Sequence, residues 1–549
     1  MADQAPQVSQ SASVLRTKPI ETILEESRET EKGLKRVLTA VDLTAIGVGA
    51  VIGAGIFVLT GTAARDAAGP GIMLSYVFAG FACILAAFCY AEFAARLPIS
   101  GSAYTYAYAS VGELAAWIIG WDLILEYTIG SSTVAVGWTH YLKELFSGLG
   151  MPLADWLLHI QFGPFAVNPM AFVVIALLCV LLCIGVKESA RFNAVMVAVK
   201  LFVVLFVIIA GLPWVKSENW QPFLPYGPMS IFQGAALIFF AYIGFDAVST
   251  AAEEVKNPQR DLPIGIIASL VICTILYVLV AAVITGMVPY PQIDAGAPLA
   301  AAFGTVGNTL AQKLIGLGGV VGLLTVMLIL LLSQPRVYYS MARDGLLWPW
   351  FSAIHPRFRT PVNATLVTCG IAAFMAAIVP MEDLHHMVSI GTLFAFVVVS
   401  ASVLIARYKT PKNEKTVIQT VLWLFFGLLL LCFGATDAIE HPIMLSLPGV
   451  GVETYNILPQ WHWPVRGVSV GFGGGLTLWF TWSLLQMKAM NLPTTFRCPL
   501  VPWVPIVAMA ANLYMMVNLN LEAWLRLFVW LALGLVIYSF YGRAHSKLN

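Results

Sequence analysis

Long apolar segments recur along the chain, and short polar stretches separate them. Most of these segments approach the roughly 20 residues that an α-helix needs to cross about 30 Å of hydrocarbon. We assign fourteen spans, at residues 40–65, 71–95, 113–140, 168–186, 192–213, 230–255, 263–287, 314–341, 362–380, 386–406, 417–434, 466–487, 500–519 and 523–541. The pattern therefore predicts an all-α polytopic membrane protein with 14 transmembrane helices.

Composition supports this class, because 59% of the 549 residues are hydrophobic and only 11% are charged. A soluble protein carries about 25% charged residues. If the N-terminus is cytoplasmic and the spans alternate, most Lys and Arg residues fall on the cytoplasmic side. We therefore expect cytoplasmic tails at residues 1–36, partly lying on the membrane surface, and at residues 542–549. The expected location is the plasma membrane, or the inner membrane if the source is bacterial.

Glycine is concentrated in one apolar stretch, IGVGAVIGAGIF at residues 46–57. Each Gly costs a helix interior roughly 1 kcal/mol relative to Ala, so a plain lipid-facing span gains nothing from this composition. One use of the glycines is close packing between helices. The other is an unwound backbone whose free N–H and C=O groups line a cavity.

A second interruption, FFAYIGFD at residues 239–246, favours the unwound backbone. Gly244 breaks the apolar run of the sixth span, and Asp246 follows it. At a rise of about 1.5 Å per residue, Asp246 lies ~15 Å from the cytoplasmic end of the span. Spans one and six are five apart, a pattern typical of inverted-repeat transporters that bind their substrate between two discontinuous helices.

Two half-helices that end at mid-depth suit a zwitterion. The N-terminus of a half-helix offers N–H groups and a positive dipole to an anion, and a C-terminus offers carbonyls to a cation. We therefore expect a zwitterion at the two breaks. Its carboxylate is expected on the amides of Ala54 and Gly55, and its ammonium on carbonyls near Ile52, Phe240, Ala241 and Ile243.

Ionisable side chains within the spans are costly, and each is a functional candidate by default. Lys200 lies about 13 Å into the fifth span and either stands in place of a sodium ion or relays protons. Asp122 and Glu126 lie one turn apart on one face of span three, where two like charges favour protonation of one of them. Glu126 contacts a substrate side chain or exchanges protons on this interpretation. A structural role is the alternative for Glu126 and for Asp246.

Three loop regions carry further expectations. Glu253 and Glu254 begin an inner loop and are expected to form a gating ion pair. Residues 344–359 are expected to form an interfacial helix, and residues 288–312 to include a short outer helix.

Several classes of protein are disfavoured. Seven of the eight cysteines lie in apolar spans without a CxxC spacing, so neither disulfides, a metal site nor a cofactor is expected. A Walker loop, a nucleophile elbow and an HExxH motif are all missing from the sequence. Basic residues form no nucleic-acid patch beyond the inner loops. We expect neither an enzyme nor a nucleic-acid-binding protein.

The chain resembles the amino acid–polyamine–organocation superfamily, and within it the cationic amino acid transporter family. The similar stretches include IGVGAVIGAGIFVLTG at 46–61, RLPISGSAYTYAYASVGELAAWIIGWDLILEY at 96–127 and FFAYIGFDAVSTAAEEVKNPQRDLPIGI at 239–266. Others are RVYYSMARDGLLWPWFSAIHPRFRTP at 336–361 and FRCPLVPWVPIVAMAANLYMM at 496–516. The AEEVKNPQRDLP and MARDGL stretches are the most specific. Pro335, just before the fourth stretch, is atypical for the family and affects the expected geometry of the eighth helix.

The resemblance implies a LeuT-type fold. Residues 37–410 would form a ten-helix core with a 5+5 inverted repeat, and residues 411–541 four additional C-terminal helices. It places the substrate carboxylate and amine on the residues already named, a sodium-replacing lysine at Lys200, and acidic pocket residues at Glu126 and Asp246.

The leading hypothesis is a secondary active transporter that imports α-amino acids by alternating access. It is expected to be proton-coupled through Lys200, Glu126 and Asp246, and sodium-independent. Cationic substrates such as arginine, lysine and ornithine are favoured, and small neutral ones such as alanine stay open. The alternatives are a uniporter or exchanger, a transporter-like amino acid sensor and, less favoured, an ion channel. Expected partners are the substrate, protons and the lipid bilayer; a small membrane accessory subunit stays unknown.

Overall fold

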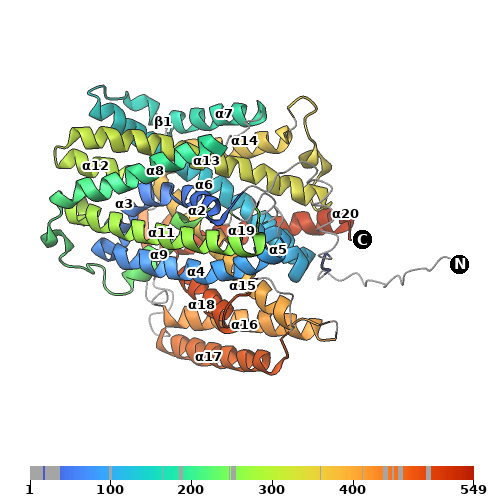
Figure 1. The fold of residues 1–549 in the computed structure, drawn as a ribbon. Coiled ribbons are helices and arrows are strands. Elements are labelled where there is room, and N and C mark those ends of the chain that lie inside the picture. The colour runs from blue at the N-terminus through green and yellow to red at the C-terminus, as the bar shows by residue number, and fades with distance from the viewer. Residues whose placement is uncertain are drawn as a thin grey trace.

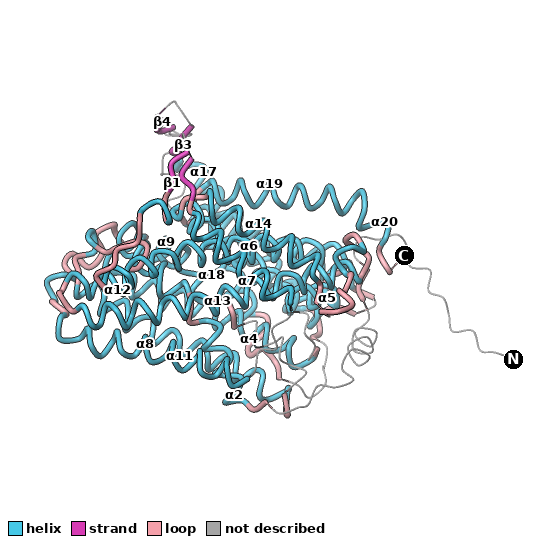
Figure 2. The backbone as a smooth tube through the Cα atoms, turned by 90° about the horizontal axis from the view of Figure 1, so that it is seen from above, coloured by secondary structure: helices cyan, strands magenta, loops and turns pink. Residues whose placement is uncertain are grey.

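The computed structural model describes residues 16–18, 38–97, 102–162, 165–184, 190–245, 248, 255–358, 360–410, 412–436, 443–447, 451–455, 462–489 and 496–548. Long helices dominate, and most of them run along one common direction (Figure 1). Helices α16, α17 and α18 form a group along one side of the bundle (Figure 1). Figure 2 shows α19 running along the margin of the bundle toward α20.

The helices are α2 (Ala40–Val51), α3 (Thr60–Ala63), α4 (Ile72–Arg96), α5 (Ser102–Ser110), α6 (Glu113–Gly148), α7 (Pro169–Ile184), α8 (Ala190–Gly211), α9 (Ser230–Ile238), α11 (Pro258–Met287), α12 (Pro298–Thr305), α13 (Thr309–Arg343), α14 (Val362–Ile378), α15 (Met381–Tyr408), α16 (Glu414–Ala435), α17 (His462–Gln486), α18 (Trp503–Val517), α19 (Leu521–Ile537) and α20 (Arg543–His545). Two short antiparallel hairpins, β1 (Ile160–Phe162) with β2 (Phe165–Val167) and β3 (Ile443–Leu447) with β4 (Gly451–Tyr455), connect helices.

Eight helical segments of the described residues are long and apolar enough to cross a membrane. They are Gly55–Arg96, Val195–Trp214, Pro258–Met287, Thr309–Arg343, Met387–Tyr408, Glu414–Ala435, Arg466–Gln486 and Leu521–His545. Their outward faces carry exposed large apolar side chains such as Ile209, Leu478 and Val529, a surface that suits lipid. The polytopic α-helical class is therefore confirmed.

Helix α6 lies at the centre of the bundle. It is 36 residues long, longer than the predicted third span, and most of its side chains are buried. It packs extensively against α13, α14 and α15, and its Trp121 and Trp117 donate indole N–H bonds to the backbone carbonyls of Trp530 and Gly534 in α19. This contact joins the C-terminal part of the chain to the centre.

The first predicted span is broken where glycine is concentrated. Helix α2 ends at Val51, and Ile52 adopts an extended conformation with φ −68° and ψ 101°. A π-helical segment, η1 (Gly55–Leu59), then resumes the course of the chain. The glycines before the break serve close packing, since a Cβ at Gly49 would lie 2.2 Å from the Val197 side chain. The sequence left two uses of glycine open, close helix packing and an unwound backbone, and the structure shows both, at different glycines.

The sixth predicted span is broken as well. Helix α9 ends at Ile238, a 3-10 turn η7 (Phe239–Tyr242) follows, and Ile243 is extended with φ −64° and ψ 142°. Gly244 has φ +113°, a conformation that L side chains rarely adopt. The predicted second interruption is thus confirmed over its described part, while Asp246, Glu253 and Glu254 lie outside the described residues.

Two other local predictions have different outcomes. The short outer helix expected within residues 288–312 is confirmed as α12. The helix expected over residues 344–359 is wrong, because only the 3-10 turn η10 (Pro349–Ser352) forms there. Gly345, with φ +84°, ends α13, and Pro349 and Pro356 each remove a backbone donor that a longer helix needs. Pro335 does not end α13, which continues to Arg343.

Buried ion pairs close one end of the bundle. We call this end the α5 end; it comprises residues 16–18, α5, the C-terminal turns of α4, α13 and α15, and residues 538–548. Glu92 accepts two bonds from Arg407, at 2.9 and 2.8 Å, and a third from the backbone N–H of Cys498. Because every charge-assisted bond in this set is buried, it fixes the ends of α4 and α15 relative to each other.

Residues 16–18 and 538–548 complete the α5 end. Lys18 pairs with Asp344 at 2.9 Å, and Tyr104 donates to the same carboxylate at 2.7 Å. Burial, and then the negative charge of Asp344, raise the pKa of Tyr104, so its hydroxyl keeps the donated proton. Glu113 is fully buried and accepts bonds from Tyr538 at 2.8 Å and from Ser546.

Candidate functional site

The two broken helices touch at their breaks. A Cβ placed on Gly55 would lie 2.0 Å from the Cα atom of Ala241, so only glycine permits this approach of the two backbones. Likewise, a Cβ on Gly244 would lie 2.8 Å from the carbonyl oxygen of Ala50. The structure therefore brings the two predicted breaks into direct backbone contact.

A small cavity of about 30 Å³ lies at this contact. Its walls include Ala54 and Gly55 from the first break, Phe240 and Ile243 from the second, and Val326 and Leu330 from α13. A space of this size accommodates about one water molecule. An amino acid would therefore enter only after the surrounding helices separate.

Backbone polar groups are available at the first break. Ala54 and Gly55 begin the helical segment after it, where N–H groups have no acceptor within the helix. Ile52 lies in the break with its own N–H bonded back to Val48. Ala54 and Ile52 are almost completely buried, so these polar groups lie inside the protein.

The carbonyls of the second break are partly engaged. The Phe240 carbonyl accepts a bond from the N–H of Ile243 at 3.1 Å, and the Tyr277 hydroxyl lies 3.0 Å from the Ala241 carbonyl. The same hydroxyl lies 2.8 Å from the Val51 carbonyl, so Tyr277 connects both breaks. Each carbonyl keeps a second lone pair for a ligand.

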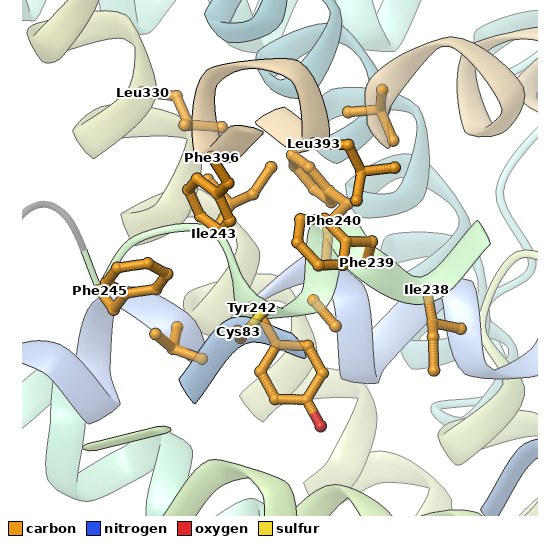
Figure 3. Packing of buried hydrophobic residues seen from close by; sticks show 14 of the residues in the cluster. Cys83, Ile238, Phe239, Phe240, Tyr242, Ile243, Phe245, Leu330, Leu393 and Phe396 are labelled. Atoms are coloured by element: carbon orange, nitrogen blue, oxygen red, sulfur yellow. The ribbon is translucent and has the colours of Figure 1, made fainter. Parts of the chain in front are cut away.

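An aromatic wall lies beside the second break. Figure 3 shows Phe239, Phe240, Ile243 and Phe245 on the break with Phe396 close to them. Phe396 belongs to α15, and its ring centroid lies 5.5 Å from that of Phe239 and 5.1 Å from that of Phe245. Movement of α15 would therefore change the surroundings of the break.

Lys200 lies next to the glycine-rich stretch, as its depth in the sequence suggested. Its side chain is 2% exposed, and its ammonium donates a 2.9 Å bond to the Gly49 carbonyl in the last turn of α2. A Cβ on Gly322 of α13 would contact its aliphatic stem at 3.6 Å. Lys200 thus links α8, α2 and α13 close to the first break.

The acidic residues of α6 lie along the same side of that helix. Glu126 is 5% exposed, and Gly130, one turn further, packs against the Phe240 ring. Asp122 is fully buried and faces α15. The structure therefore brings Glu126 to the face of α6 that meets the second break, while Asp246 stays outside the described residues.

A family model described as amino acid permease matches residues 38–465, and a model of the C-terminus of this permease type matches residues 496–546. The first model alone covers more than half of the chain. The chain belongs to the amino acid permease family.

Relatives in this family span nearly the whole chain. The branched-chain amino acid permease BcaP of Bacillus subtilis is 41% identical, over 98% of this chain and 99% of that protein. The methylthioribose transporter of the same organism is 39% identical, over 98% and 100%. The vacuolar cationic amino acid transporter 4 of Arabidopsis thaliana is 36% identical, over 98% and 96%. The resemblance to the cationic amino acid transporter family is therefore confirmed, and the family is one of transporters rather than enzymes.

Sequence reasoning missed two features of this candidate site. Tyr277 and Phe396 both lie in apolar spans, where an aromatic residue reads as a lipid or interface contact. No spacing motif distinguishes them from such residues. Only the course of α11 and α15 beside the breaks shows that they line the site.

Proposed function

We propose that this chain is a secondary active transporter that carries α-amino acids across a membrane by alternating access. The observation that carries the proposal is the backbone contact of two interrupted helices, Gly55 against Ala241, inside the bundle. Broken helices are tolerated within a membrane where they line a protein cavity and meet a ligand. The proposed architecture is LeuT-type, with a 5+5 inverted repeat in residues 37–410, four more helices in residues 411–541, and fourteen spans in all.

The substrate carboxylate binds the amides of Ala54 and Gly55 in this proposal. These amides open a helical segment, where both the free N–H groups and the helix dipole favour an anion. The ammonium binds carbonyls at Ile52, Phe240, Ala241 and Ile243. The buried position of both sets supports these roles, because a ligand would satisfy polar groups that water does not reach.

The substrate side chain decides between two amino acid classes. A cationic side chain of arginine, lysine or ornithine would pair with Glu126 and Asp246. A small neutral side chain would fit the apolar walls at Ile243, Val326 and Leu330. One relative is named for branched-chain amino acids, which are neutral, and another for cationic amino acids, so family membership does not select between neutral and cationic substrates.

Coupling is assigned to protons rather than sodium. Lys200 places a buried cationic group on the Gly49 carbonyl beside the first break, which supports its standing where a sodium ion would otherwise bind. Glu126 and Asp246 are the proposed carboxylates of the proton path. Uniport, exchange and amino acid sensing are the alternatives within the same fold.

The cellular setting completes the proposal. The protein lies in the plasma membrane, or a bacterial inner membrane, with both termini in the cytoplasm. The distribution of Lys and Arg supports this orientation. The α5 end, which holds both terminal segments, is then the cytoplasmic end.

Competition uptake in proteoliposomes tests the function. Radiolabelled arginine and alanine are compared with an inward proton gradient and no sodium. Saturable arginine uptake that lysine competes supports the cationic class, and alanine uptake with arginine inert supports the neutral class. If neither amino acid is taken up although both raise the melting temperature of the protein, the chain is an amino acid sensor rather than a transporter. If neither is taken up or bound, the proposal is wrong.

A further inference from the structure

Asp122 differs from the other buried carboxylates that the structure describes. Its side chain is fully buried in the N-terminal third of α6. Among the described residues, neither of its carboxylate oxygens has a hydrogen-bond partner. Buried polar groups are normally bonded, so an unpaired carboxylate calls for a specific explanation.

Asp122 lies directly against α15. A Cβ on Gly391 would lie 3.0 Å from one carboxylate oxygen and 3.3 Å from the other, so the Asp122 carboxylate packs on the backbone of α15 here. Thr392, the next residue of α15, also has a buried hydroxyl without a partner in the described part of the chain. The Asp122 carboxylate at this contact with α15 is therefore polar but unbonded among the described residues.

The two sides of this contact are held differently. On α6, the adjacent Trp121 exchanges two 2.8 Å bonds with Trp530 of α19, which anchors the helix. On α15, Phe396 lies five residues beyond Gly391 and packs on the second break. A movement of α15 that opens the break would therefore also separate Gly391 from Asp122.

The charged groups on the packed elements are committed elsewhere. Arg407 of α15 pairs with Glu92, and Arg526 of α19 lies near Asp383 and Glu522. Tyr104 of α5 donates to Asp344, and Tyr538 after α19 donates to Glu113. The other titratable groups on these helices are Tyr106 and Tyr108 on α5, Glu126, Tyr127, His140, Tyr141, Lys143 and Glu144 on α6, Lys313, Arg336, Tyr338, Tyr339 and Arg343 on α13, Cys369 on α14 and Tyr408 on α15. Glu382, His385 and His386 of α15, like Asp246, have side chains outside the described residues.

An ionised carboxylate without a partner is very costly in an apolar interior, so such a group takes up a proton instead. We propose that Asp122 is a proton-carrying residue of the transport cycle, neutral while α6 and α15 are in contact at Gly391. When α15 moves away and water enters, the O–H bond of the acid breaks. The proton passes to that water and leaves the carboxylate on Asp122. The inference rests on the proposed transport function and adds a carrier to it.

Asp122→Asn tests the proposal, because the amide has nearly the same shape and stays neutral. The variant is reconstituted in proteoliposomes with whichever of arginine or alanine the unsubstituted protein takes up. Exchange of labelled for unlabelled amino acid at equal pH needs no net proton movement and should stay within about twofold of the parent. Accumulation driven by an inward proton gradient should fall at least about tenfold, and exchange should lose the part of its pH dependence that Asp122 contributes.

Gly391→Ala provides a second measurement that does not remove the carboxylate. The added methyl group presses on Asp122 and loosens the contact, so the pH profile of exchange should shift toward lower pH. In the Asp122→Asn background the same substitution should leave the profile unmoved. Gradient-driven accumulation by Asp122→Asn at the parental level overturns the proposal. If Asp122→Asn does not fold, an unshifted profile in Gly391→Ala overturns it.

The two proposals fail differently. If the parent protein takes up no amino acid, the transport function itself is wrong. If the parent shows proton-driven uptake and Asp122→Asn shows the same, only the role of Asp122 is wrong.

Discussion

The α5 end and the crossing of the two broken helices are both deeply buried, yet they are held together in different ways. At the α5 end, the carboxylates of Glu92, Glu113 and Asp344 each accept a hydrogen bond from a side-chain donor. At the crossing, contact is made by backbone against backbone, and carbonyls and amides are left with capacity for another partner. The first arrangement favours one fixed geometry, whereas the second is completed by a ligand.

The difference predicts a separation of effects. Substitutions at the α5 end should lower the free energy of unfolding more than they alter substrate handling. Substitutions at the crossing should do the reverse. Four changes test this separation; Arg407→Met is expected to affect stability most and Lys409→Ala least.

Arg407→Met should destabilise most, because it removes one partner of a buried ion pair and leaves Glu92 without its main counter-charge. Breaking such a pair costs about 3–5 kcal/mol. Thermal unfolding in detergent, followed by tryptophan fluorescence, measures the loss. The double variant Glu92→Gln with Arg407→Met should lose less than the single one. A single variant as stable as the parent would contradict the structural role of the pair.

Gly55→Ala should abolish uptake, because the methyl group has no space against Ala241. Overpacking of this kind costs about 1–3 kcal/mol of stability, while amino acid uptake should fall by at least about 100-fold. Gly370→Ala in α14 is the matched control, since nothing lies within 4 Å of its added carbon. Normal uptake by Gly55→Ala would show that the close contact of the breaks is dispensable.

Lys200→Met should separate binding from coupling. The substitution removes the 2.9 Å bond to the Gly49 carbonyl, a bond to a charged donor of a kind worth about 1.5–3 kcal/mol. We expect pH-driven accumulation to fall at least about tenfold, with the protein still folded by size-exclusion chromatography. An unchanged pH dependence of uptake would remove Lys200 from the proton linkage.

Lys409→Ala should have the smallest effect. Lys409 and Glu414 pair at 2.7 Å, but Glu414 is 39% exposed, so water screens the pair. Such pairs contribute about 0.2–1 kcal/mol. The melting temperature should stay nearly unchanged, and uptake should be normal. A loss as large as that of Arg407→Met would mean that burial does not explain the difference between the two ion pairs.

The sequence allowed the breaks to be found, because glycine and a mid-span charge leave local signals within a few residues. Stretches 46–57 and 239–246, and the burial of Lys200, follow from such signals. The pairing of Tyr538 with Glu113 could not be predicted, since the partners are separated by 425 positions and neither has a local motif. The helix predicted over 344–359 does not form. The prediction relied on the apolar content of this stretch and gave too little weight to Gly345 and Pro349.

The site was predicted only in part for the same reason. Backbone groups at Ala54 and Gly55 follow from where a helix stops and restarts, which the sequence encodes locally. The Tyr277 hydroxyl between Val51 and Ala241, and the unbonded state of Asp122, depend on which helices become neighbours. Those neighbours are set by packing across the whole bundle.

The partners of Glu113 have a consequence for how the protein is made. This carboxylate is reached by Ser546, 433 positions later, and the Arg16 side chain beside it donates to the Leu548 carbonyl. During synthesis, this charge acquires its full set of partners only after Ser546 and Leu548 have been added. A product that ended just before Ser546 would therefore contain every helix from α2 to α19, yet present an under-satisfied buried charge to cellular quality control.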